Sequence, residues 1–534
     1  MLELIPADQL SEEQKAFRPY PSPFGVTLPI YRCLREPDWQ QLLDDNICIW
    51  RDNGTFLCLS EIAKRVFQER HVCFRLAKQV GVIYGKTDEA IAETAAWFWT
   101  LQHSDNQKRL VIEIDDCRDE FRFNSAALRP EELVSILDAN RQLSLRCGTW
   151  TAEQSVVLAT RPYSMTLKLD DDSCFQDKGA AFVEALERRK SSFGSLHMSS
   201  TSSFFRPDLR QVCSTNIRRL LQQKNTFDKL AMGALYRKEE ILDSFSAPVN
   251  ALSCEVHADC LTPRDFENLP IAAKDLDIAF NLDLVHDWAD LLISFLNRLA
   301  ELGHLERLRF TACWEDYFPV ESDTEDSDEE DSFYERKLPD ASEVKPVAEA
   351  LIRVIKGNPY LTHLRLGKDH GNIDWTPHFK GVFKALEVHK RMRTLVVEGE
   401  PPTTNIYPWM RKLLSRNRSI VVLDESGDKL SNGRRINRLY ALNRLYNGSA
   451  SLLEAPTEVR SLFVPMALTK RTARKFQHAA LLLFDHTVTL CEYMESVDLD
   501  ELDADGEATL DESNTALSSD ASHPRGGLKR KREL

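Results

Sequence analysis

Two matching stretches decide the fold of this 534-residue chain: NPYLTHLRLG at 358–367 and KRMRTLVVEG at 390–399. Both follow the pattern L-x-x-L-x-L, with apolar residues at Leu361, Leu364 and Leu366 and then at Met392, Leu395 and Val397. A helix-like run separates the two central residues, Leu364 and Leu395. A strand buries alternate side chains, and a helical return brings the next strand beside it. The spacing therefore predicts a repeated strand–helix unit.

The same unit can be followed along the chain by its central apolar residue. The successive central positions are Leu143, Leu167, Leu196, Leu230, Leu252, Leu276, Leu308, Leu364, Leu395 and Leu423. All the steps between them are of similar length except the step from Leu308 to Leu364, which is much longer. Asn281 and Cys313 follow two of the predicted strands, where an inward side chain can satisfy backbone groups at the bend. The pattern predicts about ten copies of one unit.

This pattern resembles the leucine-rich repeat, and the step length resembles its ribonuclease-inhibitor-like subclass, over about residues 105–425. The resemblance implies an α/β fold, a curved, right-handed solenoid. Its parallel strands would line the concave face and its helices the convex face. It also implies a non-catalytic scaffold that binds another protein through the concave face, with no cofactor.

The remainder of the chain divides around this array. Residues 1–104 lack the repeat and read as an irregular, helix-rich N-terminal module, and residues 105–428 form the solenoid. Residues 429–494 read as a helical C-terminal cap, and residues 495–534 as a disordered tail, first acidic and then basic. The helices expected outside the repeat are Ser60–Glu69, Thr87–Leu101, Ile436–Leu445 and Lys475–Tyr493.

The long step has a cause in an acidic insertion at about 316–342. Within it, residues 321–332 read ESDTEDSDEEDS, and eight of these twelve residues are acidic. Such a run repels itself and cannot bury a core, so it predicts a disordered loop. Hydroxyl groups among carboxylates resemble acidophilic-kinase substrates, and the candidate phosphorylation sites are Ser322, Thr324, Ser327 and Ser332.

Four basic or titratable residues should lie together on the concave face: Arg307, Arg309, His363 and Arg365. They point away from the core in two neighbouring copies, one repeat apart. A basic patch suits an acidic segment of a partner protein, or phosphate. Two other interpretations stay open. The chain's own acidic loop could fold over the patch and screen it, or the loop could be a plain solvated loop.

Charge and hydropathy limit the class of protein. The net charge of −15 argues against a nucleic-acid binder, and no apolar run approaches the roughly 20 residues of a membrane span. The N-terminus lacks the basic and apolar regions of a secretory signal, so an intracellular place, cytoplasmic or nuclear, is expected. KRKR at Lys529–Arg532 reads either as a nuclear-import signal or as a solubilising tail.

One cluster, CEVHADC at 254–260, has the residue types of a zinc site. However, the repeat register assigns Cys254 to the core and His257 to the position of Asn281, and no second ligand pair stands nearby. The twelve cysteines lack CxxC pairs and are expected to be reduced. A structural role is therefore favoured, and no metal is expected.

Two other functions remain as alternatives. Residues 28–53 faintly resemble an F-box, with a Leu-Pro start and a late Trp-Arg, which would imply a substrate adaptor of a ubiquitin ligase. Pro37 interrupts the middle of that stretch and departs from the pattern. The sequence contains no nucleophile elbow, Walker loop, dinucleotide fingerprint or H-E-x-x-H motif, but an enzyme with an unrecognised site is the second alternative.

Overall fold

A computed structural model describes most of the chain. The described residues are 2–16, 29–34, 42, 47–59, 70–76, 79–101, 109–113, 123–146, 148–169, 173–199, 212–283, 285–314, 339–367, 373–397, 406–456, 459–460, 463–464, 466 and 476–496. The chain divides into two compact units, residues 1–443 and 444–534. The first unit carries the sheet and the candidate site.

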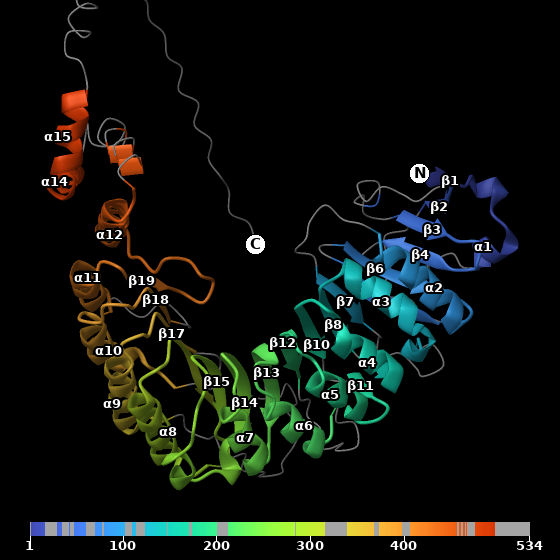
Figure 1. The fold of residues 1–534 in the computed structure, drawn as a ribbon, viewed down its shortest axis with the longest axis horizontal. Coiled ribbons are helices and arrows are strands. Elements are labelled where there is room, and N and C mark those ends of the chain that lie inside the picture. Colours follow the sequence, from blue (N-terminus) through green and yellow to red (C-terminus); the bar gives the residue numbers. More distant parts are fainter. Residues whose placement is uncertain are drawn as a thin grey trace, which may run out of the picture. The chain divides into compact units, whose positions relative to one another are not determined.

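The first unit is a mixed α/β structure built on a long sheet of 17 described strands (Figure 1). The first six form what we call the N-terminal sheet: β1 (Leu2–Leu4), β2 (Ile30–Cys33), β3 (Ile47–Trp50), β4 (Phe56–Leu59), β5 (His71–Leu76) and β6 (Gln79–Tyr84). The other eleven form the parallel array: β7 (Arg109–Glu113), β8 (Gln142–Arg146), β10 (Met165–Leu169), β12 (Gly194–Met198), β13 (Phe227–Leu235), β14 (Ala251–His257), β15 (Asp275–Asn281), β16 (Arg307–Cys313), β17 (His363–Leu366), β18 (Thr394–Val397) and β19 (Val421–Leu423). Two short strands, β9 (Gly148–Trp150) and β11 (Ser173–Phe175), pair separately.

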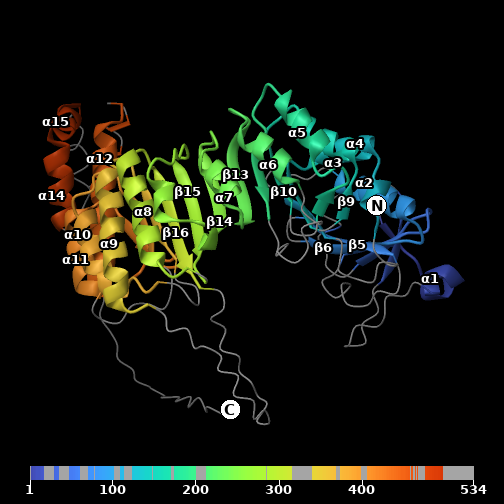
Figure 2. The same cartoon turned by 90° about the horizontal axis from the view of Figure 1, so that it is seen from below.

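Helices precede or connect the strands of the parallel array. They are α2 (Asp88–Trp99), α3 (Pro130–Ala139), α4 (Ala152–Thr160), α5 (Ala180–Glu187), α6 (Ser214–Leu221), α7 (Lys238–Phe245), α8 (Trp288–Leu302), α9 (Ala341–Gly357), α10 (Phe379–Leu386) and α11 (Ile406–Arg416). Figure 1 shows them following one another along one side of the strands, and Figure 2 shows α8, α9 and α10 standing side by side. The predicted strand–helix alternation is confirmed, except that helix α9 begins at Ala341, inside the predicted 316–342 loop.

The strands of the parallel array pair in chain order, and the predicted central leucines face one another. Leu143 pairs with Leu167, and the series continues through Leu196, Leu230, Leu252, Leu276, Leu308, Leu364 and Leu395. Each of these side chains is 0% or 1% exposed. The register prediction is therefore confirmed for these positions.

The prediction for the last central position, Leu423, is wrong. Val422 pairs with Leu395 in its place. Ile420 and Val422 are both buried. The two buried residues are thus separated by one residue, whereas the L-x-x-L pattern separates them by two. The backbone carbonyl of Val422 accepts a hydrogen bond from the hydroxyl of buried Tyr440 at 3.0 Å.

Buried polar side chains close the helix ends. Asn358 follows α9, and its Nδ2 donates to the carbonyls of Leu299 and Val354 at 3.0 and 2.9 Å. Its Oδ1 accepts from the N–H of Leu305 at 2.9 Å. These bonds satisfy backbone groups that helix ends leave without partners. His389 and Asn417 take the equivalent places after α10 and α11. A buried polar side chain therefore bonds the backbone at the end of each of these three helices.

Helices α8 and α9 approach closely where a glycine allows it. A Cβ on Gly357 would lie 2.4 Å from the carbonyl oxygen of Ala300, nearer than real Cβ atoms come. Helix α9 is also fixed at its start. The Asp340 side chain accepts from the N–H groups of Ser342 and Glu343 as an N-cap.

The N-terminal module differs from the prediction. In its described part, residues 1–104 form six strands and two α-helices, α1 (Glu12–Ala16) and α2, so the helix-rich prediction is wrong there. The reason is that short apolar runs such as Phe56–Leu59 are compatible with buried strands as well as with helices. The predicted helix at 87–101 is confirmed as α2, and the predicted helix at 60–69 lies outside the described residues. The described part of the F-box-like stretch, 28–53, contains strands β2 and β3.

The C-terminal region is helical in its described part. Helix α12 (Arg434–Leu453) begins in the first unit and ends in the second. The predicted single helix at 475–493 is two helices, α14 (Phe476–Asp485) and α15 (Thr487–Ser496). The break falls at His486, which is 2% exposed and whose ring lies 3.0 Å from the hydroxyl of Ser449. The predicted tail, 495–534, lies outside the described residues from 497 onward.

Candidate functional site

The candidate site lies on the side of the parallel array that we call the open face, formed by the strand side chains that alternate with the buried leucines. Along β15, β16 and β17, buried residues alternate with partly or fully exposed ones, and only the end of β15 departs from this pattern. The predicted residues Arg307 and Arg309 lie on β16, and His363 and Arg365 lie on β17. Arg307 pairs in register with His363, and Arg309 with Arg365. The structure therefore brings the four predicted residues together.

Two aspartates that the sequence prediction missed complete this cluster. Asp275 and Asp277 on β15 pair in register with Arg307 and Arg309. Asp275 Oδ2 lies 3.4 Å from Arg307 Nε, and Asp277 Oδ2 lies 3.4 Å from Arg309 Nη1. We call these six residues, the four predicted residues and the two aspartates, the charged patch.

The two ion pairs of the patch are partly exposed to solvent. The side chains of Arg307 and Arg309 are 56% and 40% exposed, and those of Asp275 and Asp277 are 39% and 35% exposed. Exposed pairs of this kind contribute only about 0–1 kcal/mol each. Three arginines against two aspartates leave the patch with a net positive charge when His363 is neutral. A ligand carboxylate can replace an aspartate at small cost, so the patch suits an anion.

His363 holds a special place in the patch because its charge can change. Burial lowers the pKa of His363 below its usual value, and the positive charge of Arg307 lowers it further. The carboxylate of Asp275 acts on this pKa in the opposite direction. At neutral pH the ring is therefore uncharged and half-buried beside the guanidinium groups of the patch.

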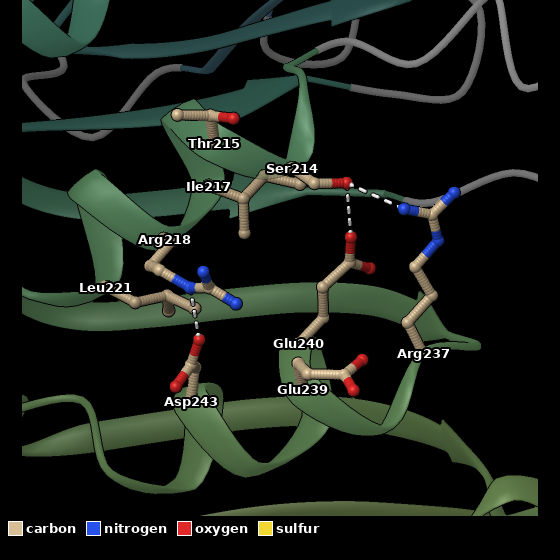
Figure 3. Close-up of a pocket in the computed structure, with 9 residues that line it drawn as sticks. All are labelled: Ser214, Thr215, Ile217, Arg218, Leu221, Arg237, Glu239, Glu240 and Asp243. Atoms are coloured by element: carbon tan, nitrogen blue, oxygen red, sulfur yellow. Dashed lines mark hydrogen bonds and ion pairs between the residues drawn. The ribbon is translucent and has the colours of Figure 1, made fainter.

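A second candidate lies between helices α6 and α7 (Figure 3). It is a pocket of about 250 Å³ lined by Ser214, Thr215, Ile217, Arg218, Leu221, Arg237, Glu239, Glu240 and Asp243. Ser214 Oγ donates to Glu240 Oε1 at 2.6 Å, and Arg218 Nε lies 2.9 Å from Asp243 Oδ2. Pockets that enclose small-molecule ligands are usually larger. Arg218 and Asp243 pair with each other, and Arg237 donates to the same Ser214 hydroxyl at 3.4 Å. The pocket is therefore a weaker candidate than the charged patch.

The Cys–His cluster at 254–260 is built into the repeat. Cys254 is 4% exposed, and burial raises the pKa of its thiol to about 12. His257 pairs in register with Asn281, as the sequence predicted, and stacks on Tyr236 at 4.0 Å between ring centroids. The described residues contain no group of three metal-ligating side chains suited to a metal ion.

Some predicted features lie outside the described residues. These are the phosphorylation sites Ser322, Thr324, Ser327 and Ser332 and the basic Lys529–Arg532. Residues 316–338 of the predicted acidic loop also lie outside, so its contact with the patch stays one of the open interpretations. Within the part of the chain that is described, no helix combines the length and the apolar character needed to cross a membrane.

No family model and no curated protein matches this chain. Its function must therefore be inferred from the geometry of its own residues. The charged patch is the strongest candidate because six charged or titratable side chains meet there on fixed strands.

Proposed function

We propose that this chain is a binding protein of the leucine-rich-repeat type, a curved solenoid whose open face holds an acidic segment of another protein. The single observation that carries this proposal is the register of β15, β16 and β17. It aligns Asp275, Arg307 and His363 in one row and Asp277, Arg309 and Arg365 in the next. Two adjacent rows give a partner two places for a carboxylate, at neighbouring levels of the sheet.

The backbone of these strands supports recognition by side chains. Strand β16 pairs on both sides, with β15 and with β17, so its backbone hydrogen bonds are used within the sheet. A partner on the open face must therefore bind to side chains. The guanidinium group of Arg presents a planar set of donors that matches a carboxylate in a bidentate pair. Because packed strands hold the backbone of Arg307, Arg309 and Arg365 in place, little ordering is needed on binding.

A direct test uses a fluorescein-labelled peptide of ten aspartates and a neutral peptide of ten asparagines. We expect the intact chain to bind the aspartate peptide, more weakly as salt rises, and to ignore the asparagine peptide. The double variant Arg307→Glu with Arg365→Glu should bind at least about tenfold more weakly, since it loses two contacts and gains repulsion. Fluorescence anisotropy gives both affinities.

A matched control makes the same charge change on the helices. Lys356→Glu with Lys384→Glu replaces two exposed lysines, on α9 and α10. This variant should bind like the intact chain. Equal weakening in both double variants would show that only overall charge matters and would overturn the proposal.

The chain's own acidic segment needs a separate arm of the experiment. A variant with the carboxylates of 321–331 changed to amides removes any competition from within the chain. This variant should bind the aspartate peptide at least as tightly as the intact chain. Absence of binding by both chains at low salt would overturn the proposed function.

A further inference from the structure

His363 is the member of the charged patch whose ordinary pKa lies near neutral pH. Arg307 pairs with it directly in register, Arg309 and Arg365 lie in the neighbouring row, and Asp275 lies in the same row beyond Arg307. On the other side its register partner is Thr394 of β18, which carries no charge.

The charge of the patch therefore depends strongly on this ring. With His363 neutral, three arginines exceed two aspartates by a single positive charge. Adding a proton to the ring doubles that net charge. Without a ligand, burial and the three arginines oppose this proton. An acidic peptide bound over the same rows carries negative charge, so it favours protonation of the His363 ring.

We propose that the His363 ring takes up a proton when an acidic peptide binds at the charged patch, so that this residue makes binding depend on pH. This inference rests on the proposed function, because it concerns the same site. The coupling is reciprocal. If the peptide favours the protonated ring, then protonation of the ring favours the peptide by the same factor. Binding should therefore strengthen as pH falls through the range in which the ring titrates.

The geometry also makes the ring available to a ligand. His363 alternates with buried Leu364 on β17, so it belongs to the open face, and it is partly exposed. A protonated imidazole offers two N–H donors to carboxylates. Histidine is the side chain whose ordinary pKa places its change of charge between about pH 5 and pH 8. Changes between pH 8 and pH 5.5 therefore report on histidines.

The test measures the affinity of the ten-aspartate peptide at pH 8.0 and at pH 5.5 in buffers of equal ionic strength. For the intact chain we expect about tenfold tighter binding at pH 5.5, because bound peptide should favour the protonated ring by that factor. His363→Gln should show no such gain, because an amide cannot take up the proton. The intact chain with ¹³C-labelled histidine, read by NMR, should show the His363 signal titrating at higher pH when the peptide is bound.

A second histidine provides a matched control. His378 is also partly buried, and burial lowers its pKa too, but it lies in a 3₁₀ turn before α10 and outside the patch. His378→Gln should keep the pH response of the intact chain.

The outcomes separate the two proposals. If His363→Gln keeps the full pH response, the proton goes elsewhere and this inference fails, while the proposed function stands. If neither the intact chain nor the chain with amides at 321–331 binds the peptide at either pH, the proposed function fails and this inference fails with it.

Discussion

The N-terminal sheet and the parallel array both bury one face in the main apolar core. They differ in whether the other face is buried or exposed. In both, one face packs into the main apolar core, with Leu57 and Leu308 both fully buried. In the N-terminal sheet the second face is also buried, around Cys58, Val82 and Phe56. In the parallel array the second face is the open face, which carries the charged patch.

The difference follows from the strand sequences. Strand β4 reads FLCL, and all of its residues are buried. Strand β16 reads RLRFTAC, in which each buried residue follows a more exposed one. In the N-terminal sheet, Ile5 and Leu10 pack on the second face, and the N–H of Ile5 donates to the carbonyl of Ile30 at 2.8 Å. The second face of the N-terminal sheet is therefore covered, whereas the alternating strands β15, β16 and β17 keep a polar surface exposed.

A new carboxylate should destabilise the chain strongly on the covered face of the N-terminal sheet and only weakly on the open face of the parallel array. Cys58→Asp places a carboxylate on the covered face, where Cys58 is 1% exposed, and we expect a loss of about 3–5 kcal/mol in the free energy of unfolding. Thr311→Asp places the same carboxylate on the open face of β16, and the expected change is within about 1 kcal/mol. Urea denaturation of both variants measures this. Equal losses would mean that the two faces do not differ as described.

Buried asparagines at helix ends should stabilise the parallel array near its first strands as much as near its last ones. Asn358→Ala removes the partners of two carbonyls and one N–H, and we expect a loss of about 2–4 kcal/mol in the free energy of unfolding. Asn140 follows α3 and also donates to two backbone carbonyls, so Asn140→Ala should cost about as much.

The control for this pair is Asn297→Ala, whose side chain bonds an exposed Arg353. This variant should cost below about 1 kcal/mol, because water can replace the lost partner. Urea denaturation compares all three variants. A large loss at Asn297 together with small losses at the two buried asparagines would show that the helix-end bonds do not matter.

The smallest effect concerns pH and belongs to the parallel array alone. The folded pKa of His363 lies below its unfolded value near 6.5, so the unfolded chain binds the proton more readily. The contribution of His363 to stability is therefore complete above about pH 6.5 and is lost as pH falls from there through the folded pKa. Because the ring is only half-buried, solvent screening keeps the effect below about 1 kcal/mol. His363→Gln should reduce the fall in stability between pH 7.5 and pH 5.5, and an unchanged fall would refute the assignment.

The repeat could be predicted from sequence because each copy has one residue that must be buried. Leu276, Leu308 and Leu364 are all 0% exposed and lie in register. The error at Leu423 arose because the last strand shortens the motif, so that Val422 takes the buried place. Spacing alone cannot show such a change when both residues are apolar.

The N-terminal sheet was missed because its signal is ambiguous. Runs such as ICIW at 47–50 are apolar throughout, and a strand buried on both faces has no alternation to distinguish it from a helix. Its mostly antiparallel pairings also join strands of unequal spacing, so no repeat marks them.

The candidate site was half predicted. The basic residues were found because they flank the central leucines of neighbouring copies. Asp275 and Asp277 were missed, although the step from them to Arg307 and Arg309 is the same as the step from Leu276 to Leu308. Applying the same step to every strand position, and not only to the leucines, would have predicted both ion pairs.

Arginine footprinting with phenylglyoxal, read by mass spectrometry, asks most simply whether the open face is the binding surface. The intact chain is labelled with and without the ten-aspartate peptide. We predict that Arg307, Arg309 and Arg365 become protected, while Arg75, an exposed residue of the N-terminal sheet, keeps its reactivity. Bound peptide with unchanged reactivity at the three patch arginines would show that the binding surface lies elsewhere.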